Sequence, residues 1–311
     1  KSKKLIQNII LFFLASFIPK TISFFMVPLY TKCLSTAEYG TVDLITTTVQ
    51  LLLPILTLQI QDAILRFSVA GQDNPREVFS IGLRIVLTGF IILSAATAIL
   101  FSFGIVQLSG AYIAFFLASY LTGALSNIVN YFLRAIDQIK KITVATVITC
   151  LVTVSCNLLF LLYFRWGVNG YLLASILGYV SSLAYLAVAA HLRNYISVRI
   201  KNPELTRRII VFSLPMIISA LSWWINNSLD KYILSFFCGV SVSGLLAVAY
   251  KVPTIISTLG ATISKAYSVS VLQYFDPSDQ DGFLGQSYAT ISFSMVLCAS
   301  ALMLLNIPLS K

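Results

Sequence analysis

Residues 81–103, IGLRIVLTGFIILSAATAILFSF, contain one charged side chain, Arg84, in a run of 23. An α-helix rises about 1.5 Å per residue, so this run is long enough to cross the hydrocarbon core of a bilayer, which is about 30 Å thick. A helix that is apolar on every side is typical of a membrane span or of the centre of a large protein. The run therefore predicts a transmembrane helix.

The same pattern recurs along the whole chain. Of the 311 residues, 58% are hydrophobic and 10% are charged, whereas soluble domains have about 45–50% and 25%. We predict an all-α polytopic membrane protein. Its nine expected spans are residues 9–32, 42–65, 81–103, 112–133, 142–163, 168–190, 209–237, 244–263 and 287–305.

Basic residues gather before the first span and at the gaps after the second, fourth and sixth spans, whereas the gap after the eighth holds only Lys265. The basic residues in or beside the rich segments are Lys1, Lys3 and Lys4; Arg66, Arg76 and Arg84; Arg134, Lys140 and Lys141; and Arg193, Arg199, Lys201, Arg207 and Arg208. The gaps between them carry at most one basic residue each, as with Lys32 or Arg165. Because lysine and arginine are retained on the cytoplasmic side, the N-terminus is predicted to be cytoplasmic. Membrane lipids, and no nucleic acid, then account for the net charge of +10.

The basic segment 191–208 divides six predicted spans from three. We predict an N-terminal lobe over residues 1–198 and a partial C-terminal lobe over 199–311. Within the segment, Asn202-Pro203 is typical of a turn that opens a helix. The sequences FIPKTIS at 17–23 and SLPMIIS at 213–219 are a weak internal repeat, which chance alone could also produce. Parallel repeats are a common plan of transporters.

Three motifs resemble the Wzx-type polysaccharide flippases of the multidrug/oligosaccharidyl-lipid/polysaccharide (MOP) exporter superfamily. They are VPLYTKCLSTAEYG at 27–40, the stretch 213–232, and VAYKVP at 248–253. The resemblance implies a MATE-like fold with two six-helix lobes around a central cavity. This chain ends after about three helices of the second lobe and begins with Lys1, so we expect it to be a fragment.

The resemblance also implies a function. Such a protein would export undecaprenyl-pyrophosphate-linked oligosaccharides by alternating access, for O-antigen, lipopolysaccharide or capsule synthesis. Its place would be the bacterial cytoplasmic (inner) membrane. A polysaccharide polymerase and a chain-length regulator are the candidate protein partners. No cofactor is implied, and coupling to H⁺ or Na⁺ stays open.

Two lysines lie inside predicted spans. Lys20 is about 11 residues into the first span, or roughly 16 Å deep, and Lys251 is about a third of the way along the eighth. Charges at such depth are costly and normally face protein or water. The free-energy cost of moving a pyrophosphate through the bilayer core without a cationic partner is very high. We therefore expect Lys20, Lys251 and Arg66 to bind this headgroup through charge-assisted hydrogen bonds.

Three further charged residues are candidate substrate ligands. Asp62 stands four residues before Arg66, a spacing that predicts an ion pair with either a structural or a substrate role. Asp230 and Lys231 end the seventh span near the outer face, where an interface position alone could explain them, although the family resemblance favours a role in binding. Solvation explains the outer acids Asp43 and Glu38. Amphipathic side chains suited to sugars, or else to helix packing, are Tyr30, Tyr131, Trp223, Trp224, Asn226, Asn227 and Tyr250.

Two other functions stay open. A cation-coupled drug antiporter of the same fold needs an acid deep in a lobe, whereas the deep charges here are lysines. A membrane polysaccharide polymerase or ligase needs a long external loop with catalytic groups, and the outward gaps here are short. We therefore predict a transporter and not an enzyme. The five cysteines have no metal-ligand spacing and are interpreted as small buried apolar residues.

Overall fold

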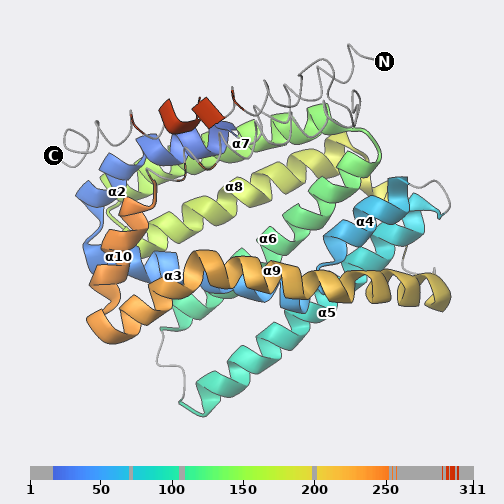
Figure 1. Ribbon diagram of the computed structural model, residues 1–311, viewed down its shortest axis with the longest axis horizontal. Coiled ribbons are helices and arrows are strands. Elements are labelled where there is room, and N and C mark those ends of the chain that lie inside the picture. The colour runs from blue at the N-terminus through green and yellow to red at the C-terminus, as the bar shows by residue number, and fades with distance from the viewer. Residues whose placement is uncertain are drawn as a thin grey trace. The chain divides into compact units, whose positions relative to one another are not determined.

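The computed structural model describes residues 17–69, 73–104, 109–197 and 202–251, with a few single residues between 254 and 300 (Figure 1). Every regular element in these ranges is a helix. The chain divides into two compact units. One is Pro28–Ala247, and the other is formed by the segments that precede and follow it. The predicted all-α class is confirmed for the described part of the chain.

Most of the helices belong to the unit Pro28–Ala247. In chain order the elements are α2 (Val27–Cys33), α3 (Thr36–Leu56), α4 (Ile60–Val69), α5 (Pro75–Ser102), α6 (Gly110–Ala135), α7 (Ile139–Asn157), its π-helical continuation η1 (Leu158–Tyr163), α8 (Gly167–Ala189), the 3₁₀ turn η2 (Leu192–Tyr195), α9 (Pro203–Cys238) and α10 (Val240–Ala249). Six helices in the described ranges are long and apolar enough to cross a membrane, counting α7 with η1 as one. The third to seventh predicted spans correspond to α5 through α9. The first, eighth and ninth lie partly or wholly outside the described residues.

Local sequence signals explain where these helices begin. Asn202 accepts a hydrogen bond from the backbone N–H of Leu205, and Pro203 takes the first helical position of α9. The side chain of Ser35 accepts from Glu38 N, while the Glu38 carboxylate accepts from Ser35 N, so α3 begins with a capping box. Such caps satisfy backbone donors that a helix start leaves unpaired. The turn predicted at Asn202-Pro203 is confirmed.

The second predicted span, 42–65, is wrong as a single helix. α3 ends at Leu56 and α4 begins at Ile60. Between them Leu58 and Gln59 have φ angles of 52° and 49°, in the left-handed region, which costs a non-glycine residue about 1–2 kcal/mol. Pro54, inside the last turn of α3, lacks the N–H that would extend the helical ladder. Apolar residues continue through the break, so hydropathy does not reveal it.

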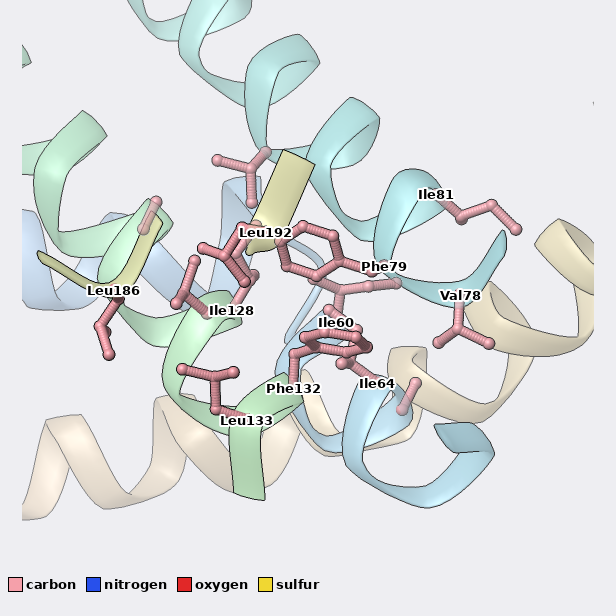
Figure 2. Close-up of a cluster of buried hydrophobic side chains, with 14 of the residues drawn as sticks. Ile60, Ile64, Val78, Phe79, Ile81, Ile128, Phe132, Leu133, Leu186 and Leu192 are labelled. Carbon is pink, nitrogen blue, oxygen red and sulfur yellow. The ribbon is translucent and has the colours of Figure 1, made fainter. Parts of the chain in front are cut away.

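The largest buried cluster lies where α4, α5 and α6 meet η2 and the C-terminal end of α8 (Figure 2). The rings of Phe79 and Phe132 are 4.5 Å apart, and Tyr195 of η2 packs edge-on against Phe132. Leu205 and Ile209, from the first turns of α9, belong to the same cluster. The start of α9 is therefore held by the helices that precede it in the chain.

A stripe of small residues lets α7 and α8 approach closely. Gly170, Ala174, Gly178 and Ser182 are all buried on α8. A Cβ atom added at Gly178 would overlap Thr153 Oγ1 of α7 and approach the Thr149 carbonyl oxygen to 3.0 Å. Small side chains at four-residue spacing permit such contacts between membrane helices.

Candidate functional site

Helix α9 presents three different faces. Its buried face, with Trp224 and Ser228, packs on α3, which runs beside it (Figure 1). A second face is exposed and apolar, and comprises Ile218, Ile225, Leu229 and Ile233. A third face is exposed and polar or aromatic, and comprises Trp223, Asn226 and Asn227. Residues three and four apart share one side of a helix, so Trp223 shares a side with both asparagines, and Asn226 also borders the apolar face next to Leu229.

The polar face of α9 does not suit contact with lipid. Trp223 is 67% exposed, and Asn226 and Asn227 are also exposed. Amide groups in a bilayer core are costly unless they meet protein or water. The neighbouring apolar face is suited to acyl chains. The arrangement is that expected of a helix that borders a cavity on one side and lipid on another.

Polar contacts of Trp224, Lys231 and Tyr232 join α9 to α3, and we call them the α3–α9 seam; one of them is a 3.5 Å hydrogen bond from the Tyr232 hydroxyl to the Leu44 backbone oxygen. Lys231 Nζ lies 2.9 Å from Asp43 Oδ2 and donates to Asp43 Oδ1 at 3.1 Å. The hydroxyls of Thr48 and Tyr232 are 2.6 Å apart. The remaining contact is made by Trp224, whose Nε1 donates to the backbone oxygen of Thr47 at 3.0 Å. Early residues of α3 pair with late residues of α9, so the helices are antiparallel here.

The ion pair of the seam is largely shielded from solvent. The side chains of Lys231 and Asp43 are 14% and 19% exposed. The interpretation of Asp43 as a solvated outer acid was therefore wrong. Lys231, a predicted substrate ligand, is engaged by Asp43 in this structure, and the neighbouring Asp230 accepts a hydrogen bond from the backbone N–H of Lys231 at 2.9 Å. Their role in binding stays a prediction.

The two lysines of the predicted spans lie in the other unit. Lys20 is exposed on a helical segment that covers residues 17–25. Lys251 is half-buried, and its Nζ donates to Ser23 Oγ at 3.1 Å. Ser23 follows Lys20 by three residues, so the two share one side of their helix. Lys251 is therefore bound to the side of the helix that carries Lys20.

Asp62 and Arg66 do not form the ion pair that their spacing predicts, although both lie in the described part of α4. Asp62 Oδ2 accepts a hydrogen bond from Gln59 Nε2 at 3.0 Å. The Arg66 guanidinium instead lies 4.4 Å from the ring centroid of Phe212 on α9. Arg66 therefore makes a cation–π contact with Phe212. Asp62 accepts instead from Gln59, which lies in the break between α3 and α4.

Two of the amphipathic side chains proposed for sugars are buried in the protein. Trp224 is 7% exposed and belongs to the seam. Tyr30 is 5% exposed, and its hydroxyl accepts from Asn157 Nδ2 at 3.1 Å. These two are packing groups. The exposed members of the set on α9 are Trp223, Asn226 and Asn227.

Comparison with solved structures shows the fold. An inward-facing multidrug resistance MATE family transporter of the MOP superfamily aligns with a TM-score of 0.66 at 17% identity, over 93% of this chain and 70% of that one. An outward-facing one gives 0.58 at 17%, over 95% and 77%. A mutant of the Vibrio cholerae MATE transporter VcmN gives 0.55 at 13%, over 85% and 67%.

None of the curated proteins matches the chain. The polysaccharide biosynthesis protein family matches residues 5–270, which is most of the sequence. Family and fold together support a multi-pass membrane exporter or flippase, as the motifs predicted. The chain belongs to the polysaccharide biosynthesis protein family.

Proposed function

We propose that the protein is a flippase that moves undecaprenyl-pyrophosphate-linked oligosaccharides across the bacterial cytoplasmic membrane, with its N-terminus in the cytoplasm. The observation that carries the proposal is the exposed polar face of α9. Trp223 offers a flat ring to a sugar face, and the Asn226 amide and the Asn227 amide oxygen offer hydrogen-bonding groups to hydroxyls, while Asn227 Nδ2 donates to the Trp223 backbone oxygen at 2.7 Å. Family membership favours a glycan over a drug as the cargo.

The pyrophosphate headgroup has a separate binding requirement. A phosphate oxygen can replace the Ser23 hydroxyl as acceptor for the Lys251 ammonium, so that the acceptor as well as the donor carries a charge. Two opposite charges at hydrogen-bond distance attract each other more strongly than a charge attracts a neutral hydroxyl. Lys20, one helical turn from Ser23, supplies a second cation. Together the two lysines offset the charge that the bilayer penalises.

Alternating access requires a contact that forms and breaks. The seam pair Asp43–Lys231 joins α3 of the predicted N-terminal lobe to α9 of the predicted C-terminal lobe. In the predicted topology the pair lies near the outer surface. Its separation would let water solvate both charges and open a release path, and its formation would close that side. Asp230 and Lys231 then contribute to the outer gate.

The test is surface polysaccharide in cells whose own exporter has been deleted and replaced by the full-length protein. We expect Lys20→Ala, Lys251→Ala and Asn226→Leu each to lower surface polysaccharide at least tenfold, about 1.4 kcal/mol, with normal amounts of protein in the membrane. Lys251→Arg keeps the charge and should retain more export than Lys251→Ala.

Two substitutions serve as matched controls for this experiment. Lys140→Ala removes an exposed charge at the start of α7, and Ile225→Ala alters the apolar face of α9. Both should leave export unchanged. Normal polysaccharide in all three test variants would refute the site, and equal loss in the controls would show a general folding effect.

A cation-coupled drug antiporter is the second candidate, because the fold is that of MATE transporters. Everted membrane vesicles with an imposed pH or sodium gradient distinguish the two functions. Gradient-driven accumulation of a cationic dye would favour the antiporter. Both the family and the fold favour a transporter over a membrane polymerase or ligase.

A further inference from the structure

A groove of about 630 Å³ lies between the first third of α5 and the first two turns of α9. It is distinct from the seam and from the polar face of α9. Its lining residues are Arg84, Asn202, Pro203, Thr206, Arg207, Ile210 and Val211. Two guanidinium groups and no carboxylate line it, next to an apolar wall.

The two arginines are held differently. Arg84 Nη2 donates to the backbone oxygen of Ser197 at 3.1 Å, which fixes its guanidinium beside the chain that leads into α9. Arg207 is exposed and makes no hydrogen bond or ion pair with any residue of the described ranges. The next residue, Arg208, pairs with Asp73 at 3.2 Å. Within the described ranges, Arg207 is therefore a groove arginine whose guanidinium has no protein partner.

The level of the groove in the membrane fits a lipid headgroup. Arg84 stands three residues after the predicted start of the third span, and Arg207 two residues before that of the seventh. Both spans are odd-numbered, so both arginines are expected at the cytoplasmic interface. Long basic side chains at this level extend toward the phosphate layer.

We propose that this groove binds an anionic phospholipid, with its phosphate between Arg84 and Arg207 and an acyl chain along Ile210 and Val211. Charge complementarity favours an anionic over a zwitterionic headgroup, because each basic residue near an anionic lipid surface contributes about 1 kcal/mol. The apolar wall favours a lipid over a free phosphate, since only the lipid covers it.

The bound lipid would connect the two predicted lobes. The groove is bordered by α5, where the Glu77 carboxylate accepts from Asn202 Nδ2 at 3.0 Å, and by α9, which Asn202 caps. A ligand that bridges α5 and α9 binds only while they stay together. It should therefore stabilise this arrangement against unfolding.

Native mass spectrometry of the detergent-purified protein tests the proposal with phosphatidylglycerol, phosphatidylcholine and inorganic phosphate as probes. We expect retention of phosphatidylglycerol in preference to phosphatidylcholine, and no displacement by excess inorganic phosphate. Arg207→Gln should weaken phosphatidylglycerol binding about fivefold, the equivalent of about 1 kcal/mol. The side chain replaced is exposed, so folding should be unchanged.

Arg76→Gln is the matched control, because Arg76 is an exposed arginine on α5 that does not line the groove. It should bind phosphatidylglycerol as the unaltered protein does. Equal retention of both lipids, full retention by Arg207→Gln, or equal loss in Arg76→Gln would each overturn the proposal. Displacement by inorganic phosphate would overturn the lipid assignment in favour of a simple anion site. Transport plays no part in this measurement.

Discussion

At the scale of single residues, Asp43 shows that a carboxylate two turns into an apolar helix can belong to the protein interior. Its side chain is 19% exposed, and both of its oxygens lie within 3.1 Å of Lys231 Nζ. The attraction offsets the desolvation of both groups only while both are present. Either residue alone would leave a shielded charge without its partner.

We therefore expect Asp43→Asn to destabilise the protein by about 3–5 kcal/mol, the usual cost of removing one partner of a buried pair. Thermal unfolding in detergent measures this change. Glu204→Gln is the control, because Glu204 is an exposed carboxylate in the first turn of α9. That loss should cost about 0–1 kcal/mol. Equal effects of the two substitutions would show that the seam pair is worth no more than a surface charge.

Sequence patterns identified which residues of the candidate site are charged within spans, but not how those residues pair. Lys20 and Lys251 could be singled out because a charge in an apolar run is unusual. The partner of Asp43 lies 188 residues away along the chain, a distance at which no local spacing rule applies. The failure at Asp62 and Arg66 has a similar cause, since Phe212 of a distant helix competes for the guanidinium.

At the scale of helices, close packing depends on where a side chain is missing. Gly178 on α8 faces Thr149 and Thr153 of α7, and its missing Cβ allows the two helices to touch. Gly123, in the middle of α6, has ordinary clearance, because its added Cβ would lie 3.8 Å from Leu53 Cδ1. Glycine is therefore required for close helix packing at Gly178, but not at Gly123.

Gly178→Ala should destabilise the protein by about 1–3 kcal/mol, because the added methyl group forces α7 and α8 apart. Gly123→Ala should instead be neutral or stabilising by up to about 1 kcal/mol, because alanine favours the helix. Chemical or thermal unfolding of both variants in the same detergent measures the contrast. A stabilising Gly178→Ala would contradict the close contact.

Five of the nine predicted spans could be matched to helices in the described ranges, because an apolar run of about 20 residues can cross a membrane only as a helix whose backbone groups bond to each other. The second predicted span differs, because it is not a single helix. In the second span α3 ends at Leu56, and Leu58 and Gln59 adopt left-handed angles. Local hydrogen bonds, such as that from Gln59 N to the Pro54 oxygen, accompany the break, and hydropathy does not predict it.

At the scale of the whole molecule, the alternation of charge between gaps predicts the orientation, whereas family and fold do not depend on it. The turn between α6 and α7 contains Asp137 and is followed by Lys140 and Lys141. The turn between η1 and α8 contains only Arg165 as a basic residue. α7 with η1 is 25 residues long and separates the two turns, so they lie on opposite sides of the membrane.

Asp137→Cys and Arg165→Cys test this orientation in a variant that lacks the five native cysteines. Both positions are exposed, so either thiol can react once a reagent reaches it. A maleimide that cannot cross membranes should label Arg165→Cys in intact spheroplasts and Asp137→Cys only after permeabilisation, because basic turns stay in the cytoplasm. The reverse pattern would place the N-terminus outside. The groove at Arg84 and Arg207 would then meet the outer leaflet, and the seam pair Asp43–Lys231 would close the cytoplasmic side.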